Sequence, residues 1–357
     1  MNPSSRIIHI SDIHCTTRNY LIGFNLGTAI GTVLTGGLAG DPTVGAYQDT
    51  PAKCGELVTF LINSKEILRT NRMVITGDLV DSAERYDFNS YARQYLLDPL
   101  TANGFDVTVV PGNHDYFVDG VQFRTGHIAD GATAFFNTFS SFMKTTSPNA
   151  YPVDLDLGGG NHLVLLNSVK GHYDVETGSH RSQGNIGQEQ MNWLRNALPQ
   201  FQQGRAAGNK VAIAMHHSPF VQSGDIELTD AVEFLDVVRD KIDAMMFGHT
   251  GNPHQFYLNG YADTYGIPVI TSENIDAMSG DGYRVSVVDL TFNQVEVYST
   301  RLGLLAVEKG IPDTRVSVPM IWFLTNSAGG VRPAQGEVDR VRWTPRTGRG
   351  LGRAGTA

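Results

Sequence analysis

Cysteine is scarce in this chain of 357 residues, which contains only Cys15 and Cys54. A scaffold held together by several disulfides is therefore excluded, and the scarcity fits a reducing compartment. We expect Cys15 to be a packed residue. Basic residues are also few: 27 lysines and arginines stand against 36 aspartates and glutamates, which gives a formal net charge of −9. Because such a surface repels a phosphate backbone, we expect no nucleic acid as a partner.

The amino terminus has no secretory signal pattern, because Met1 to Arg6 do not form a charged segment followed by an apolar one. We therefore expect a cytoplasmic protein. Charge is absent from Tyr20 to Gly40, a stretch that approaches the roughly 20 residues needed to cross a bilayer. Because this stretch lies between two segments that we assign below to one site, we expect a buried or lid-forming insertion. A membrane-associated scaffold is the alternative.

Hydrophobic residues make up 41% of the chain, which suffices for a folded core, and the length suits one large domain with appendages. Short apolar runs alternate with amphipathic stretches, which is typical of an α/β fold. The predicted strands are Arg6 to Ile10, Met73 to Thr76, Val107 to Val110, His162 to Asn167, Lys210 to Met215, Ala244 to Phe247, Val269 to Thr271, Tyr283 to Leu290 and Gln294 to Ser299, the last two joined by a hairpin turn. The predicted helices are Ala52 to Thr70, Ser90 to Asn103, Thr133 to Lys144, Gly187 to Gln202 and Asp230 to Asp240.

The alternation weakens after Leu302, and residues 332–357 are rich in Gly, Pro, Thr and Arg. We expect one main domain in residues 1–302, with a glycine-rich insertion at 16–52 near the mouth of the site. Residues 303–357 would then be a C-terminal extension that ends in a flexible basic tail. A basic arm for an anionic partner is the alternative for the tail.

Polar residues with metal-binding chemistry follow the first two of these strands. Asp12 and His14 are two positions apart, so on an extended strand end both side chains point the same way and one cation can bind both. Gly77 permits a tight turn that exposes the carboxylate of Asp78, which could bridge two cations with its two oxygens. The alternative for this second group is a simple turn in which Asp81 caps a helix.

Three further groups follow later strands. The turn Pro111-Gly112 presents the amide oxygen of Asn113 and the imidazole of His114. Two histidines leave the strand that ends at Met215, and one more follows Gly248; they are His216, His217 and His249. Each group alone could be a solvated loop or a hydrogen-bonded structural histidine. Together they form a set of oxygen and nitrogen ligands without thiolate, which suits Mn, Fe or Zn.

In this order the groups make the chain resemble the calcineurin-like metallophosphoesterase family, whose motifs are D-x-H, G-D-x-x-D, G-N-H-[DE], a later His and G-H-x-H. The resemblance runs from His9 to about Leu290, and the first three motifs match completely. It implies a four-layer α/β/β/α sandwich of two mixed β-sheets flanked by helices. It also implies hydrolysis of phosphodiester or phosphomonoester bonds of small molecules, including nucleotides, by a hydroxide that bridges two metal ions. The chain looks most like bacterial phosphodiesterase-type members.

The resemblance implies a role for each matching residue. The first metal would be held by Asp12 and His14, and Asp78 would bridge both metals. The ligands implied for the second metal are Asn113, His216 and His249, with His217 as the alternative to His216. His114 would act on the leaving oxygen as an acid or an electrophile, and Asp81 would orient it.

The last motif departs from the family pattern. Gly251 stands where the family has a histidine that binds the first metal, and a glycine has no side chain to coordinate. His254 is the nearest substitute, although a surface histidine is the simpler interpretation. We therefore expect a weaker or more selective first site. The alternative function is a nearly inactive family member that binds a nucleotide or metal and turns over poorly.

Overall fold

The structure of the protein, a computed structural model, describes most of the chain between residues 5 and 332. The described residues are 5–15, 50–81, 83, 86–116, 128–169, 183–205, 208–219, 228–249, 269–271, 282–291, 294–309, 324–326 and 330–332. Several sequence expectations lie outside them: the stretch from Tyr20 to Gly40, residues Gly251 and His254, and the tail beyond Arg332. Within the described part of the chain, no helix is both long and apolar enough to cross a membrane.

A six-stranded mixed sheet forms one half of the molecule, in the order β11-β10-β9-β1-β2-β3. Strands β1, β2 and β3 are parallel, whereas β9, β10 and β11 continue the sheet in antiparallel pairs. The bounds are β1 Arg6–Ile10, β2 Arg72–Ile75, β3 Asp106–Val109, β9 Arg284–Asp289, β10 Gln294–Ser299 and β11 Gly303–Lys309. The sheet therefore runs past residue 302, where we expected the main domain to end.

A five-stranded sheet forms the other half, in the order β4-β5-β6-β7-β8. Strands β5 to β8 are parallel, and β4 is an antiparallel edge strand. The bounds are β4 Val153–Gly158, β5 Asn161–Leu165, β6 Val211–Ala214, β7 Ala244–Phe247 and β8 Val269–Thr271. A separate pair, β12 Leu324–Asn326 and β13 Gly330–Arg332, is antiparallel.

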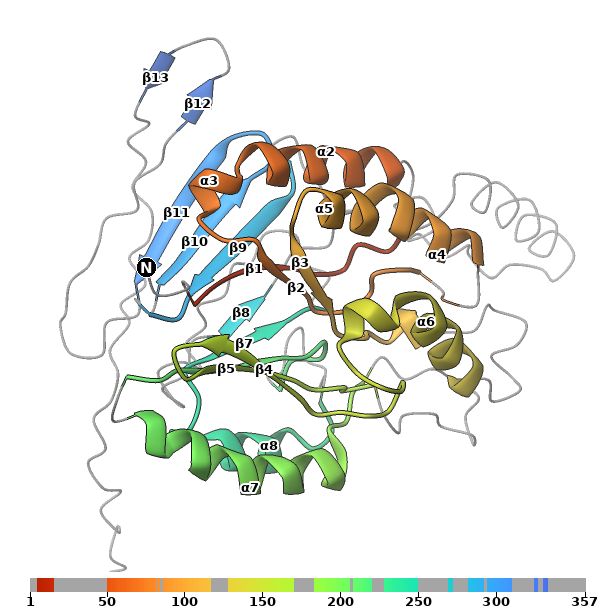
Figure 1. Cartoon of the computed structure of the whole chain (residues 1–357), viewed down its shortest axis with the longest axis vertical. Helices are drawn as coiled ribbons and strands as arrows, with labels where there is room; N and C mark the ends of the chain where they lie inside the picture. The colour runs from red at the N-terminus through yellow and green to blue at the C-terminus, as the bar shows by residue number, and fades with distance from the viewer. Residues whose placement is uncertain are drawn as a thin grey trace, which may run out of the picture.

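Helices cover the outer faces of both sheets, so the molecule has four layers (Figure 1). Over the six-stranded sheet lie α2 Thr50–Asn63, α3 Lys65–Leu68, α4 Tyr86–Ala92 and α5 Asp98–Ala102, with a π-helical segment, Arg93–Leu97, joining the last two. Over the five-stranded sheet lie α7 Gly187–Arg205 and α8 Ala231–Val238, while α6 Ile128–Met143 packs against β3. The expected α/β/β/α sandwich of two mixed sheets is confirmed.

Alternate side chains of β6 point to opposite faces of its sheet, and both faces are buried. Ala212 and Ala214 belong to the core shared by the two sheets, whereas Val211 and Ile213 pack with residues of α7 and α8. All four residues are fully buried. A parallel strand covered on both sides is apolar throughout, which is why the sequence showed it as a short continuous hydrophobic run.

An ion cluster joins the amino-terminal end of β1 to β9 and β10. The guanidinium of Arg6, only 3% exposed, donates to Asp289 at 2.9 Å and to Glu296 at 2.6 Å. Its Nε also donates to the main-chain oxygen of Leu68. Burial works against the charge on Glu296, but the hydrogen bonds and positive charges around it, with the bond from Arg6 the largest of them, together outweigh burial and lower the pKa of that carboxyl. The cluster lies at the opposite end of β1 from Asp12 and His14.

Candidate metal centre

Five strands from both sheets end at one place, and each carries one of the polar groups. Strands β1, β2 and β3 come from the six-stranded sheet, and β6 and β7 come from the five-stranded sheet. Direct contacts link all eight residues that the sequence singled out for the site: Asp12, His14, Asp78, Asp81, Asn113, His114, His216 and His249. Residues that are remote in the chain therefore form one cluster.

One half of the cluster is rich in carboxylates. The ligand atoms of Asp12, His14 and Asp78 lie within 4.8 Å of one another, and all three residues are buried. The Nε2 atom of His14 is 3.6 Å from Oδ2 of Asp78, while its Nδ1 atom is 3.7 Å from Oδ1 of Asp81. A cation placed here would meet two carboxylates and one imidazole.

The other half is built around His216. Its Nδ1 lies 2.7 Å from the main-chain oxygen of Thr76, and because a carbonyl only accepts, Nδ1 carries the hydrogen. Nε2 is therefore the ring nitrogen that faces the cluster, 2.9 Å from Oδ1 of Asn113 and 3.1 Å from Nδ1 of His249. A ligating histidine is typically held in this way, by a bond from its other ring nitrogen.

Asp78 lies between the two halves. Its Oδ2 atom is 3.6 Å from Nε2 of His14 and 3.2 Å from Nε2 of His216. Its Oδ1 atom accepts the main-chain N–H of His114 at 2.9 Å, which fixes the carboxylate. One oxygen, rather than the two we expected, thus faces both halves.

His114 and Asp81 form a pair at the edge of the cluster. The Nδ1 atom of His114 is 3.2 Å from Oδ1 of Asp81 and 3.2 Å from its main-chain oxygen. The side chain of His114 is 26% exposed, in contrast to the buried ligand candidates. Its ring packs edge-on against that of His14, with centroids 4.6 Å apart. The pair thus lies where an outside molecule can reach it.

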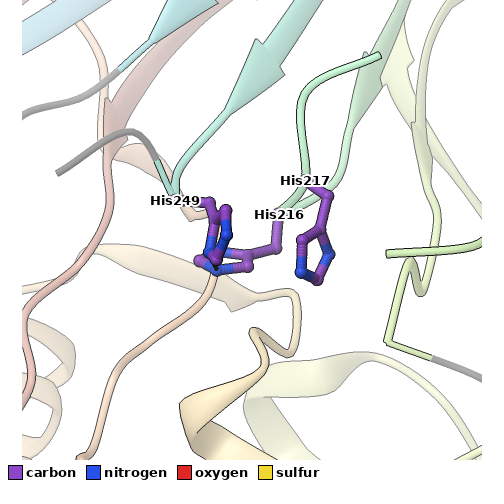
Figure 2. A group of neighbouring side chains, drawn as sticks. All are labelled: His216, His217 and His249. Atoms are coloured by element: carbon purple, nitrogen blue, oxygen red, sulfur yellow. Dashed lines mark hydrogen bonds between the residues drawn. The ribbon is translucent and has the colours of Figure 1, made fainter. Parts of the chain in front are cut away.

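His217 lies inside the cluster with His216 and His249 (Figure 2). The ligand atoms of the three histidines are within 4.8 Å of one another. The Nδ1 atom of His217 is 2.8 Å from Oγ of Ser168, and the same Oγ accepts the main-chain N–H of His217 at 3.1 Å. Sequence reasoning offered His217 only as a substitute for His216; the structure brings both into the cluster.

Glycines make room for these side chains. A Cβ on Gly112 would lie 2.2 Å from Oδ1 of Asp78, and one on Gly248 would lie 2.0 Å from Oγ of Ser11 and 2.6 Å from Oδ2 of Asp12. Real Cβ atoms do not approach other atoms this closely, so any side chain at these positions would displace the carboxylates. The motif glycines are therefore steric requirements of the cluster.

The backbone is strained at four of the ligand candidates. Positive φ angles occur at Asp12 (55°), His14 (47°), Asp78 (50°) and His249 (67°). Residues other than glycine adopt this left-handed conformation at a cost, and such residues gather at functional sites. The main-chain bonds His14 N–H to Asp78 O, at 2.8 Å, and Asp12 N–H to Gly77 O, at 3.0 Å, hold these turns in place.

The electrostatics of the cluster favour a cation. Burial lowers the pKa of His216, yet the charge and hydrogen bond of Asp78 outweigh it and raise the pKa to about 9. Burial also lowers the pKa of His14, but its hydrogen bond to Asp81 and the charge of Asp78 act against burial, and the pKa rises to about 10. Burial and the charge of His216 lower the pKa of His249 to about 3, so this imidazole is neutral, the form that binds metals. Buried carboxylates thus create a negative field that a metal ion can neutralise.

Two buried residues support the site without having been singled out by the sequence analysis. Asp115 accepts the main-chain N–H groups of Val80 at 3.0 Å and Gly112 at 2.8 Å, so it joins the second and third polar groups. Ser168 orients His217 from the end of β5. Ser168 directly follows a predicted apolar strand, and Asp115 stands at the acidic position of the third motif, but nothing in the sequence identified their partners.

The donors fit two metal ions. They are carboxylate oxygens, one amide oxygen and imidazole nitrogens, which bind first-row transition metals. Asp78 is shared, so the described residues give each half at least three donors. Gly251 and His254 lie outside the described residues, so the loss of a ligand at Gly251 and its replacement by His254 stay sequence expectations.

Comparisons with known proteins agree with this geometry. A family model described as calcineurin-like phosphoesterase matches residues 5–253. None of the curated protein sequences compared with the chain matches it. A solved dimetal phosphatase from Danio rerio is similar at 14% identity, covering 83% of this chain and 96% of that one, with a TM-score of 0.54. A calcineurin-like phosphoesterase from Bacillus subtilis is 15% identical, covering 82% of this chain and 84% of that one, with a TM-score of 0.36. The first of these likenesses supports the fold.

Proposed function

The chain belongs to the calcineurin-like phosphoesterase family, and we propose that it hydrolyses phosphodiester or phosphomonoester bonds of small molecules at a two-cation centre. Membership makes it a metal-dependent phosphoesterase; the kind of bond and the residue roles are the proposal. One observation carries it: Oδ2 of Asp78 lies 3.6 Å from Nε2 of His14 and 3.2 Å from Nε2 of His216. A carboxylate shared by two cations needs this position between two sets of donors.

The ligands divide into two sets around Asp78. We assign Asp12 and His14 to the first cation, with Asp78 shared. The ligands assigned to the second cation are Asp78, Asn113, His216 and His249. Contacts of 2.9 to 3.2 Å among the donor atoms of the second set support its assignment. Mn, Fe and Zn all suit such oxygen and nitrogen donors.

When bound, the two cations supply an acidified water and the positive charge that stabilises the phosphoryl oxygens during in-line attack. The chain itself supplies the acid. Because Nδ1 of His114 is held by Asp81, the proton destined for the leaving oxygen is carried on Nε2. Asp81 orients that imidazole through the same contact.

Small substrates suit this site better than nucleic acids. The net charge of −9 repels a long phosphate backbone, whereas a single phosphoester is attracted once the cations are in place. We propose a phosphodiester as the preferred bond and a nucleotide as one substrate class, on the resemblance to phosphodiesterase-type members. A poorly active binding member is the alternative that Gly251 suggests.

The test uses bis-p-nitrophenyl phosphate and p-nitrophenyl phosphate with added Mn²⁺. We expect the rate of nitrophenol release to fall by more than about 100-fold in Asp78→Ala. Mutation of a residue that merely hydrogen-bonds a metal ligand already lowers metal affinity or activity by about 10- to 100-fold. Asp106→Ala is the matched control, since that carboxylate is 57% exposed and forms a surface ion pair with Lys144. Release that survives Asp78→Ala would refute the site, and no release with any metal would favour the binding member.

A further inference from the structure

We propose that His217 is a third imidazole ligand of the second cation, which makes that cation's site rich in nitrogen and the first cation's site rich in oxygen. The proposal rests on the two-cation centre above and adds a residue to its ligand set. It also implies that the two sites select different metals.

The geometry places His217 with the other two histidines. The ring centroids of His217 and His249 are 4.6 Å apart, closer than the 4.9 Å between His216 and His249. His216 and His217 are also 4.9 Å apart, with nearly perpendicular rings. Figure 2 shows the three rings beside one another at the ends of β6 and β7. His217 is therefore one of three histidines whose ligand atoms all lie within 4.8 Å of one another.

Ser168 contacts both the main chain and the ring of His217. Its hydroxyl oxygen accepts the main-chain N–H of His217 at 3.1 Å and lies 2.8 Å from the ring Nδ1. Because a hydroxyl can donate or accept, the proposal includes the tautomer in which Nδ1 donates its hydrogen to Ser168 and the lone pair of the ring is on Nε2. His216 has the same arrangement, with the main-chain oxygen of Thr76 in place of the hydroxyl. Metal-binding histidines generally donate their other ring N–H to such an acceptor.

The ring of His217 is also fixed from its other side. Gly184 packs against it so closely that a Cβ there would lie 2.4 Å from Cγ of the imidazole. Both His217 and Ser168 are fully buried. A ring held by a hydroxyl and a glycine backbone cannot turn away from the cluster without displacing main chain, so it is preorganised for the cation.

The ligand sets that result differ in chemistry. The second cation would have three imidazoles, the amide oxygen of Asn113 and the shared carboxylate of Asp78. The first would have one imidazole, from His14, and two carboxylates, from Asp12 and Asp78. Imidazole suits zinc, cobalt and ferrous iron, whereas carboxylate and water suit manganese and magnesium. We therefore expect a zinc-type ion at the second site and a manganese-type ion at the first.

The direct test counts imidazoles on the wild-type protein. The chain is prepared with ¹⁵N-labelled histidine, freed of metal and loaded with ¹¹³Cd²⁺, and the ring nitrogens that couple to one cadmium nucleus are counted by NMR. Three coupled imidazoles on one cadmium support the proposal, and two overturn it. A chain that binds no cadmium and no Mn²⁺ would instead refute the two-cation centre itself, so the two failures are distinguishable.

Variants test the same proposal through affinity. Co²⁺ binding is measured by competition with a chelating dye, and thermal melting checks that each variant is folded. We expect His217→Ala to weaken cobalt binding at the tighter site by about 10- to 100-fold, and Ser168→Ala to weaken it by a smaller factor. His162→Ala is the control, because that histidine pairs with Asp154 and stacks on Phe201. Cobalt affinity in a folded His217→Ala that equals the wild-type value overturns the proposal.

Discussion

The carboxylate of Asp78 reaches His216 across the boundary between the two sheets, with 3.2 Å between Oδ2 and Nε2. Asp78 follows β2 of the six-stranded sheet, and His216 follows β6 of the five-stranded one. Neither sheet contains the whole site. The packing of the sheets therefore determines the geometry of the centre, and changes in the turns at the boundary should alter metal binding and stability together.

The substitution Gly77→Ala should weaken metal binding and lower the stability of the fold. Gly77 has a φ of 96°, and a Cβ there would lie 2.5 Å from Nδ1 of His216 and 2.7 Å from the backbone of Gly112. We expect the free energy of unfolding to fall by about 2–4 kcal/mol, since backbone strain alone costs 1–3 kcal/mol. Urea titration measures it. Gly55→Ala, in α2 with nothing within 4 Å of its Cβ, is the control and should be stabilising by about 0.5–1 kcal/mol. Equal effects at both positions would contradict the steric account.

The sequence predicted several strand ends well because buried strands have a strong local signal, a short run of apolar residues. The predicted bounds of β1, β7, β8 and β10 agree with the structure. Strand β4 was missed: it reads V-D-L-D-L-G, and its two aspartates, Asp154 and Asp156, lie at exposed positions of an edge strand. One predicted helix is broken into α2 and α3, because the chain turns at Ser64 between them.

The sequence predicted the site residues that belong to short motifs. Asp12 and His14 lie two positions apart, and the glycine turns around Asp78 and Asn113 are visible in the sequence. The contact of Ser168 with His217 was not predictable, because it joins residues 49 positions apart that follow β5 and β6. Asp115 was within a motif that we had quoted, yet its two main-chain partners depend on how two loops pack.

Asp115→Asn should loosen the two loops that Asp115 joins. Its two carboxylate oxygens each accept one main-chain N–H, from Val80 and from Gly112. An asparagine has one acceptor oxygen, so its amide group would face an N–H donor. We expect a loss of about 1–3 kcal/mol in the free energy of unfolding, because a buried donor is left unsatisfied. Asp98→Asn is the control, since that carboxylate is 50% exposed in a surface pair with Arg93. Identical urea midpoints for the two variants would contradict this role.

Low pH should lower the free energy of unfolding because it protonates Glu296. Burial raises the pKa of this carboxyl, but the hydrogen bonds from Arg6 and Tyr298 and the nearby positive charges together lower it below its ordinary value of about 4.3. A group whose pKa is lowered on folding contributes stability that is present above its unfolded pKa and is lost as the pH falls through its folded pKa. Glu296→Gln should therefore be less stable than wild type at pH 7, and the difference should shrink as the pH falls below about 4. Urea midpoints from pH 7 to pH 3 measure it. A difference that stays constant over that range would refute the contribution of ionised Glu296 to stability.

Removal of metal should lower the melting temperature in a way that depends on Asp78. A cation that binds only the folded chain stabilises it by RT ln(1 + [L]/Kd), which is about 2.7 kcal/mol at 100 times Kd. We expect protein freed of metal by EDTA to melt earlier than protein supplied with Mn²⁺. Because Asp78 faces both halves of the centre, Asp78→Asn should lose most of this shift while remaining folded. Asp106→Asn, at an exposed carboxylate paired with Lys144, should keep it. A full Mn²⁺-dependent shift in Asp78→Asn would mean that the cations bind elsewhere in the chain.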